Sequence, residues 1–208
     1  AENPEVQQLA SAIGCLCDCD VDENRDLCRR AGAIEAVFGA MRNFSSDGNV
    51  QFHAWCGFSS LTNNVENASL LLREGINELS VQMMKEHAKS YRVREEIMQV
   101  TRLMMAILPE SREKLVQAGF LEELVRALRE EPEDQHVQAN STHNIKLLAV
   151  DDANRSALRR LGAVELLLAM FRDYSTQHGN GAQWSGDKGK ALWAIHGPAC
   201  EALSSLAA

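Results

Sequence analysis

The chain has 208 residues, of which 45% are hydrophobic and only 5% aromatic, so there is enough apolar side chain for a mainly aliphatic core. The formal net charge of −8 argues against nucleic acid as a ligand and favours basic partners. No stretch approaches the roughly 18 consecutive apolar residues of a transmembrane helix, so we expect no membrane span.

The first predicted elements are a helix over residues 4–18 and then two helices joined by a glycine. The segment Asn24–Arg42 (NRDLCRRAGAIEAVFGAMR) predicts a short helix capped by Asn24, a corner at Gly32 and a second helix. Glycine suits the corner because a chain that ends one helix and starts another within two residues needs a positive φ. Three residues of the short helix are predicted to face the core: Leu27, Cys28 and Ala31.

The same block recurs three more times, at Asn67–Glu86, Ser111–Glu130 and Asn154–Asp173. Its corner glycines are 43, 44 and 43 residues apart: Gly32, Gly75, Gly119 and Gly162. A second marker, a valine followed by Gln or Arg, keeps the same spacing at Val6, Val50, Val93 and Val137. Two independent markers with a period of roughly 40–47 residues indicate a helical repeat protein.

The second and third copies depart from this pattern. Asn77 and Ser80 stand where apolar residues are expected after Gly75, so we expect that helix to be rotated or slightly strained. Asn67 is predicted to cap the short helix of the second copy, and Ser111 replaces asparagine as the cap in the third.

The chain ends with an irregular stretch and a last helix. Residues 173–187 are rich in Gly, Ser and Asn, and we interpret them as a mobile insertion. Residues 181–208 are predicted to form a degenerate helix, interrupted at Pro198, that covers the open end of the stack. The covering residues are predicted to be Trp193, Ile195, Leu203 and Leu206. The chain opens AENPEVQ without a Met, so we expect a processed chain or part of a longer one.

The charged clusters are interpreted as solvated surface. Arg29–Arg30 and Arg159–Arg160 precede corner glycines at the C-terminal end of a short helix, where the helix dipole favours cations. Binding of phosphate or of an acidic partner by these arginines is the alternative. Two acidic stretches, Glu130–Asp134 and Asp151–Asp152, are likewise interpreted as solvated loops.

Six cysteines suggest no disulfide framework or metal site. A thiolate site would use Cys15, Cys17, Cys19 and Cys28. Cysteines two apart on a helix point to different sides, however, and structural zinc prefers Cys pairs on turns. We therefore predict reduced thiols in a reducing, cytoplasmic compartment, with no metal and no cofactor.

Two His–Cys pairs share a helix face and invite a nucleophile–base interpretation. They are His53 with Cys56 and His196 with Cys200. Neither pair has a third orienting group or an oxyanion donor, and no phosphate-binding, zinc-protease or serine-hydrolase motif occurs. We therefore predict that the chain is not an enzyme.

The order of short helix, glycine corner, helix, loop and longer helix beginning Val-Gln resembles the armadillo repeat. The family phrase stands here as NRDLCRRAGAIEAV and NRSALRRLGAVELL, and four clear cycles run from Val6 to about Phe171. HEAT repeats, which lack the short first helix and the glycine corner, are the alternative. The resemblance implies an all-α fold, a right-handed α-solenoid of about four to five three-helix repeats in a single domain, 1–208. The repeats are expected at about 4–48, 49–90, 91–134 and 135–180.

In this family the third helix of each unit lines a concave groove that holds an extended peptide or a partner's helix. Importin-α-like members carry a Trp and, one turn later, an Asn on that helix. The Trp column here holds Ala12, Cys56, Gln99 and His143, and the Asn column holds Leu16, Ser60, Leu103 and Leu147. The Trp–Asn array is therefore absent, although Trp55 and Asn63 lie close enough for a slip of one residue to remain an alternative. We expect a generic interaction groove rather than nuclear-import binding.

Polar side chains at repeat spacing on the third helices can pair with an extended ligand. We predict eight partner-binding residues: His53, Cys56, Ser60, Glu96, Gln99, Asn140, His143 and Lys146. The predicted function is a non-catalytic protein–protein interaction scaffold, alone or as a module of a larger assembly. The alternative is a regulatory armadillo domain that modulates an enzyme or a small GTPase. The oligomeric state is not predicted.

Overall fold

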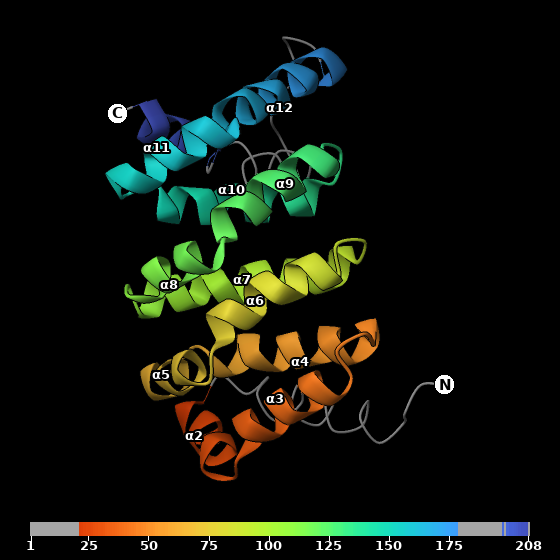
Figure 1. Cartoon of the computed structure of the whole chain (residues 1–208), viewed down its shortest axis with the longest axis vertical. Helices are drawn as coiled ribbons and strands as arrows, with labels where there is room; N and C mark the ends of the chain where they lie inside the picture. The colour runs from red at the N-terminus through yellow and green to blue at the C-terminus, as the bar shows by residue number, and fades with distance from the viewer. Residues whose placement is uncertain (1–20, 179–196, 198, 208) are drawn as a thin grey trace. The chain divides into compact units, whose positions relative to one another are not determined.

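The computed structural model describes residues 21–178, 197 and 199–207, and every regular element in this part is a helix (Figure 1). The helices are α2 (Asp22–Arg30), α3 (Ala33–Asn43), α4 (Gly48–Leu61), α5 (Val65–Arg73), α6 (Ile76–Glu86), α7 (Tyr91–Ile107), α8 (Ser111–Ala118), α9 (Phe120–Glu130), α10 (Gln135–Leu148), α11 (Asp152–Leu161) and α12 (Ala163–His178). Residues 199–207 are also helical. The chain divides into two compact units, Ala1–Ala118 and Gly119–Ala208. The helix predicted over residues 4–18 lies outside the described residues.

Four glycines make the sharp corners predicted from the repeat. Their φ angles are +77° at Gly32, +86° at Gly75, +95° at Gly119 and +85° at Gly162, and each separates a short helix from the next one. A left-handed conformation costs a residue with a Cβ roughly 1–2 kcal/mol, so glycine is favoured at this one place in each block. The regular spacing of these glycines in the sequence therefore marks a positive φ angle that recurs once in each repeat.

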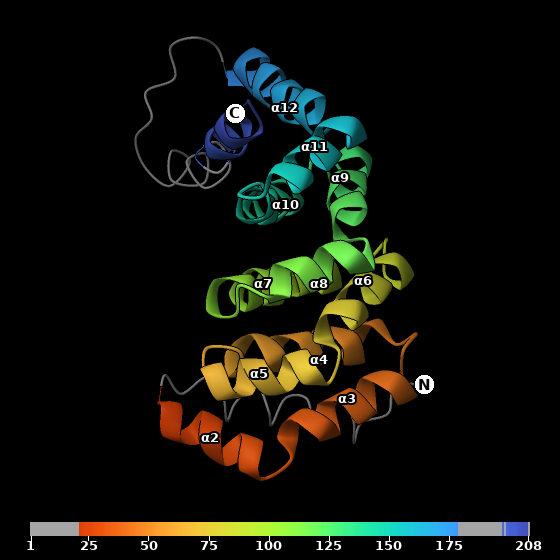
Figure 2. The same ribbon diagram turned by 60° about the vertical axis from the view of Figure 1, so that its left-hand side comes forward.

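In the first unit, α4 and α7 lie side by side (Figures 1 and 2). The core of this unit is aliphatic with a small aromatic cluster in which the Phe58 ring lies 4.9 Å from Phe38 and 5.9 Å from Trp55. The predicted apolar stripes of α3 and α4 are buried as expected: Ile34, Val37, Phe38 and Met41, and Val50, Ala54, Phe58 and Leu61.

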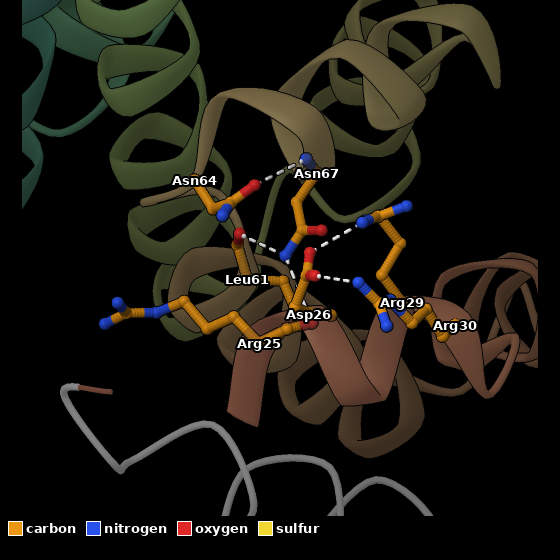
Figure 3. A network of polar contacts seen from close by, with 7 residues as sticks. All are labelled: Arg25, Asp26, Arg29, Arg30, Leu61, Asn64 and Asn67. Carbon is orange, nitrogen blue, oxygen red and sulfur yellow. Dashed lines mark hydrogen bonds and ion pairs between the residues drawn. The ribbon is translucent and has the colours of Figure 1, made fainter. Parts of the chain in front are cut away.

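The predicted asparagine caps were wrong. Helix α2 begins at Asp22, so Asn24 lies inside it, and α5 begins at Val65, so Asn67 lies inside that helix. The cap of α5 is Asn64, whose side chain accepts the Asn67 backbone N–H at 3.1 Å (Figure 3).

The asparagine of the repeat phrase has a different task. The Asn67 side chain donates to the carbonyl of Leu61, the last residue of α4, at 3.1 Å, and to the Arg25 carbonyl at 3.4 Å. Asn154 makes the equivalent bond to the carbonyl of Leu148, the last residue of α10, at 3.0 Å. The last carbonyls of a helix have no partner within it. This asparagine therefore fixes α5 and α11 to the end of the long helix before each of them.

The glutamine of the Val-Gln marker also satisfies carbonyls at a helix end. The Gln51 side chain donates to the carbonyls of Met41 and Phe44, at 3.0 and 3.1 Å. Gln138 repeats the arrangement with the carbonyls of Leu128 and Glu131, at 3.3 and 2.8 Å. The asparagine of the repeat phrase and the glutamine after the marker valine are thus explained by backbone carbonyls that would otherwise be buried without a partner.

Aspartates cap α10 and α11. Asp134 accepts the N–H groups of His136 and Val137 at 2.9 and 3.0 Å, and Asp151 plays the same part for α11. Asp134 and Asp151 lie in loops, as predicted, and Asp151 is exposed. The prediction was wrong for Glu130, which is the last residue of α9, and for Asp152, which is the first residue of α11.

The Asp134 cap is testable. We expect Asp134→Ala to lower the free energy of unfolding by about 1 kcal/mol, because two N–H groups at the start of α10 lose their acceptor. Glu133→Ala, an exposed change in the same loop, is the control and is expected to stay within about 0.5 kcal/mol of the parent. Urea unfolding followed by circular dichroism measures both, and equal values for the two variants would contradict the assignment.

Helix α6 is not rotated, contrary to the prediction. Asn77 and Ser80 have no exposed surface and occupy the inward stripe, while Leu79 is half-buried. The Ser80 hydroxyl donates to the Ile76 carbonyl at 2.7 Å. The Asn77 amide donates to the Ser111 hydroxyl at 2.9 Å and to its carbonyl at 3.2 Å, and Ser111 is the first residue of α8 rather than the residue before it. The polar stripe is tolerated because its members are hydrogen-bonded.

Helix α2 buries a narrower stripe than predicted. Cys28 is buried, but Leu27 is 62% exposed and Ala31 is exposed, so two of the three predicted inward residues were wrong. The other inward residue is Arg25, whose guanidinium donates to the Ser60 carbonyl at 3.1 Å. A cation with its head group bonded to a backbone carbonyl can take an inward position that a hydrophobic pattern does not reveal.

The paired arginines of α2 are not simply solvated. Asp26 accepts from Arg29 at 2.6 Å and from Arg30 at 3.0 Å (Figure 3). The hydrogen bond from Arg29, together with the charges of both arginines, lowers the pKa of Asp26.

In the second unit, α9 packs with α10, α11 and α12. The segment 199–207 joins this unit: Leu206 is buried, and its carbonyl accepts from Arg159 at 2.5 Å. Its predicted neighbour Leu203 is half-buried, while Trp193, Ile195 and Pro198 lie outside the described residues. Helix α12 continues to His178, so the irregular stretch predicted from residue 173 does not begin there.

Candidate partner-binding surface

The eight predicted residues share one environment. All are half-buried, and they lie on the three long helices α4, α7 and α10. The third residue after the marker valine of each helix is His53, Glu96 or Asn140. The sixth residue after it is Cys56, Gln99 or His143. Repeat-equivalent positions therefore keep polar side chains in partial contact with solvent.

The α4–α7 surface consists of Phe52, His53, Cys56, Ser59 and Ser60 from α4 with Arg92, Glu96 and Gln99 from α7. Two hydrogen bonds join the helices across it. The Gln99 amide donates to the Ser59 hydroxyl at 3.0 Å, and the Cys56 thiol is hydrogen-bonded to the Glu96 carboxylate. Five of the predicted residues therefore lie on these two helices, and the structure brings Cys56 of α4 and Glu96 of α7 together.

The pKa values of both Cys56 and Glu96 are raised where the two side chains meet. Burial, followed by the charge of Glu96, raises the pKa of Cys56 to about 12, so the thiol stays protonated and acts as a donor. Burial and the neighbouring charge of Glu95 raise the pKa of Glu96, and the bond from Cys56 only partly opposes this. The surface thus presents a carboxylate that is costly to charge.

An aromatic and cationic cluster borders the pair. The Arg92 guanidinium lies 4.0 Å from the centre of the Phe52 ring, and the His53 ring lies edge-on to Phe52 at 5.2 Å. Arg92 is exposed and Phe52 half-buried. Sequence reasoning missed both residues, although a phenylalanine next to a predicted site residue on a helix was an available signal.

In the second unit, Asn140, His143 and Lys146 lie along α10. The Asn140 carbonyl accepts from the Asn144 side chain at 2.8 Å, within the helix. Lys146 forms an ion pair with Glu201 of the C-terminal segment. This predicted site residue is therefore partly committed to contacts within the chain.

Comparisons with known proteins show the fold. No family model matches the sequence, and no curated protein matches it. Among solved structures, a designed armadillo repeat protein matches with a TM-score of 0.66 and 18% identity over 99% of this chain and 87% of that one. A second, described as a designed armadillo repeat protein in complex with the peptide (KR)4, matches with the same score and identity over 99% and 100%. An engineered protein matches with a TM-score of 0.72 and 20% identity over 96% of this chain, which spans 43% of that protein's length.

This chain has the armadillo-repeat fold. The α-solenoid of armadillo-type units predicted from the sequence is confirmed, and the HEAT alternative is set aside. At 18–20% identity the likeness concerns the fold alone.

The alternative register for the armadillo Trp column is excluded by burial. Trp55 has no exposed surface and packs edge-on against Phe58, so its indole belongs to the core. Asn63 is exposed but lies beyond Leu61, where α4 ends. Neither residue adds a recognition side chain to the α4–α7 surface.

The candidate metal and catalytic residues are only partly within the described residues. No group of three or more His, Cys, Asp or Glu side chains there could hold a metal ion. Cys28, Cys56 and Cys200 are free thiols. The remaining members of the candidate thiolate site and His196 lie outside the described residues. No described helix is both long and apolar enough to cross a membrane.

Proposed function

We propose that the chain is a non-catalytic interaction scaffold that binds a protein partner, as an extended peptide or a helix, along its long helices. The observation that carries the proposal is that half-buried polar side chains recur at the third and sixth residues after the marker valine, on α4 and α7 of the first unit and on α10 of the second. Such side chains can hydrogen-bond a peptide backbone while the rest of each helix is committed to the core.

A basic partner suits this surface. The chain has a net charge of −8, and a designed protein of the same fold is described in complex with the basic peptide (KR)4. Opposite charge speeds encounter and disfavours partners of the same charge. We propose a protein partner with lysine or arginine in the bound segment, in a reducing, cytoplasmic setting.

The test is to isolate the partner from the source under gentle conditions and to measure its affinity for matched variants. We expect Asn140→Ala and His143→Ala each to weaken binding about fivefold, because each loses a polar contact of roughly 1 kcal/mol. Ser156→Ala, an exposed change on α11 in the same unit, is the control and is expected to leave affinity unchanged.

Isothermal titration calorimetry gives the affinities, and thermal unfolding verifies that the variants are folded. Unchanged affinity in every variant of the α4, α7 and α10 positions would contradict the proposal. A partner enzyme whose activity changes on binding would point instead to the regulatory alternative.

A further inference from the structure

The Arg92 guanidinium, at the start of α7, is held against an aromatic ring of α4. It lies 4.0 Å from the centre of the Phe52 ring, and the His53 ring meets Phe52 edge-on at 5.2 Å. Among the described residues this guanidinium makes no hydrogen bond and no ion pair, and the side chain is exposed. Phe52 therefore covers one face of the guanidinium, while its other face is open to solvent.

The repeat does not require this arrangement. Phe52 is the second residue after the marker valine, and the same position holds Glu95 in α7 and Ala139 in α10. A second arginine over a phenylalanine, Arg42, lies 5.5 Å from the ring centre of Phe38, which is buried in the core. Core packing accounts for the Phe38 ring. The half-buried Phe52 ring instead supports an exposed arginine at the surface.

The charges around Arg92 favour one kind of ligand group. Glu95 and Glu96 follow it by three and four residues, so both lie within about one helical turn of it. An incoming carboxylate would approach these two acidic residues on a chain of net charge −8, and an uncharged ring avoids that repulsion. Arginine also stacks on aromatic faces. An arginine already fixed on one ring loses little freedom when a second ring covers it.

Resting on the proposed function, we propose that the bound segment places an aromatic side chain on the outer face of the Arg92 guanidinium. The guanidinium then lies between that ring and Phe52. Covering its outer face removes water from the cation, which strengthens its attraction to both rings. The segment recognised at the α4–α7 surface is therefore basic and carries a tyrosine, phenylalanine or tryptophan where it passes Arg92.

The probes are fluorescein-labelled peptides built on (KR)4, the peptide bound by a designed protein of the same fold. In each peptide one of the central residues is replaced by tyrosine, and matched peptides carry leucine or glutamate at the same place. Anisotropy titrations with the full chain give the affinities. We expect tyrosine to bind about fivefold more tightly than leucine at one of these places, the effect of one partly desolvated cation–aromatic contact. Glutamate is expected to bind more weakly than leucine there.

Variants of the chain locate the contact. Arg92→Met keeps an unbranched side chain and removes the cation, so we expect the preference for tyrosine over leucine to fall below about twofold. Arg42→Met makes the same change at the other arginine over a phenylalanine and is expected to keep the full preference. The ratio of the two peptide affinities cancels the general effect of removing one positive charge. Thermal unfolding verifies that both variants are folded.

The outcomes separate this inference from the scaffold function. A preference for tyrosine that survives in Arg92→Met, or that Arg42→Met loses as well, would overturn the stacking. So would peptides that bind equally with tyrosine and leucine at every place, or that prefer glutamate, and in each case the scaffold function stands. Absence of binding by every peptide would also overturn the inference. The proposed function is then decided separately, by the affinity of the isolated partner.

Discussion

Replacing Trp55 by alanine is expected to lower the free energy of unfolding by about 4 kcal/mol. The indole is completely buried and packs edge-on against Phe58, which itself contacts Phe38. Truncation therefore leaves a large cavity in the aromatic cluster between α3 and α4. Urea unfolding followed by circular dichroism gives the difference.

Trp55→Phe is the matched comparison. The buried indole N–H has no hydrogen-bond partner among the described residues, so its loss removes a desolvation cost as well as some packing. We expect the phenylalanine variant to lose under about 2 kcal/mol, because most of the ring volume is kept. Equal losses in Trp55→Ala and Trp55→Phe would contradict this explanation. They would mean that the lost indole N–H, and not the cavity, accounts for most of the destabilisation.

Asn77→Ala is expected to cost about 2 kcal/mol, because it removes a buried amide and leaves the Ser111 hydroxyl and carbonyl without that donor. Ser80→Ala is the control within the same buried stripe. Among the described residues its hydroxyl bonds only the Ile76 carbonyl of its own helix, so we expect a loss under about 1 kcal/mol. The measurement is the midpoint of urea unfolding at constant slope.

A double variant tests whether Asn77 and Ser111 stabilise the chain as a pair, in place of the apolar residue and the asparagine found at these positions in other repeats. Elsewhere the Ser111 position is asparagine and the Asn77 position is apolar, as Asn154 and Ile34 show. We expect Asn77→Leu with Ser111→Asn to be about 1–2 kcal/mol more stable than the sum of the single changes. Additive effects would show that the two departures from the repeat are independent.

The fold was predictable because its strongest constraint is local. A positive φ at one position per unit demands glycine whatever surrounds it, so Gly32, Gly75, Gly119 and Gly162 reveal the period directly. The apolar stripes of α3 and α4 were predictable for the same reason, since helical spacing alone decides which side chains share a face.

Contacts between distant residues were not predictable. Asn24 and Asn67 resembled N-caps because the same side chain suits a helix start, but the Asn67 amide is used six residues back on the Leu61 carbonyl. Asn77 seemed to break its stripe because its partner, Ser111, lies 34 residues away. The repeat period of the sequence does not show which distant residue will bond to a given side chain.

The candidate surface was predictable in outline only. Counting from the marker valine selected half-buried polar residues on α4, α7 and α10, because equivalent positions of a repeat share an environment. The count could not show that the Cys56 thiol reaches Glu96, or that Lys146 pairs with Glu201. These contacts depend on how long side chains bend between neighbouring helices.

Arg25 is held from two directions. Its guanidinium donates to the Ser60 carbonyl, and its own carbonyl accepts from the Asn67 side chain (Figure 3). Under mechanical tension α2 must break its bonds to α4 and α5 together, because both are made by the same residue. We expect α2 to separate from the two helices in one step, which a pulling experiment would record as a single extension rather than two.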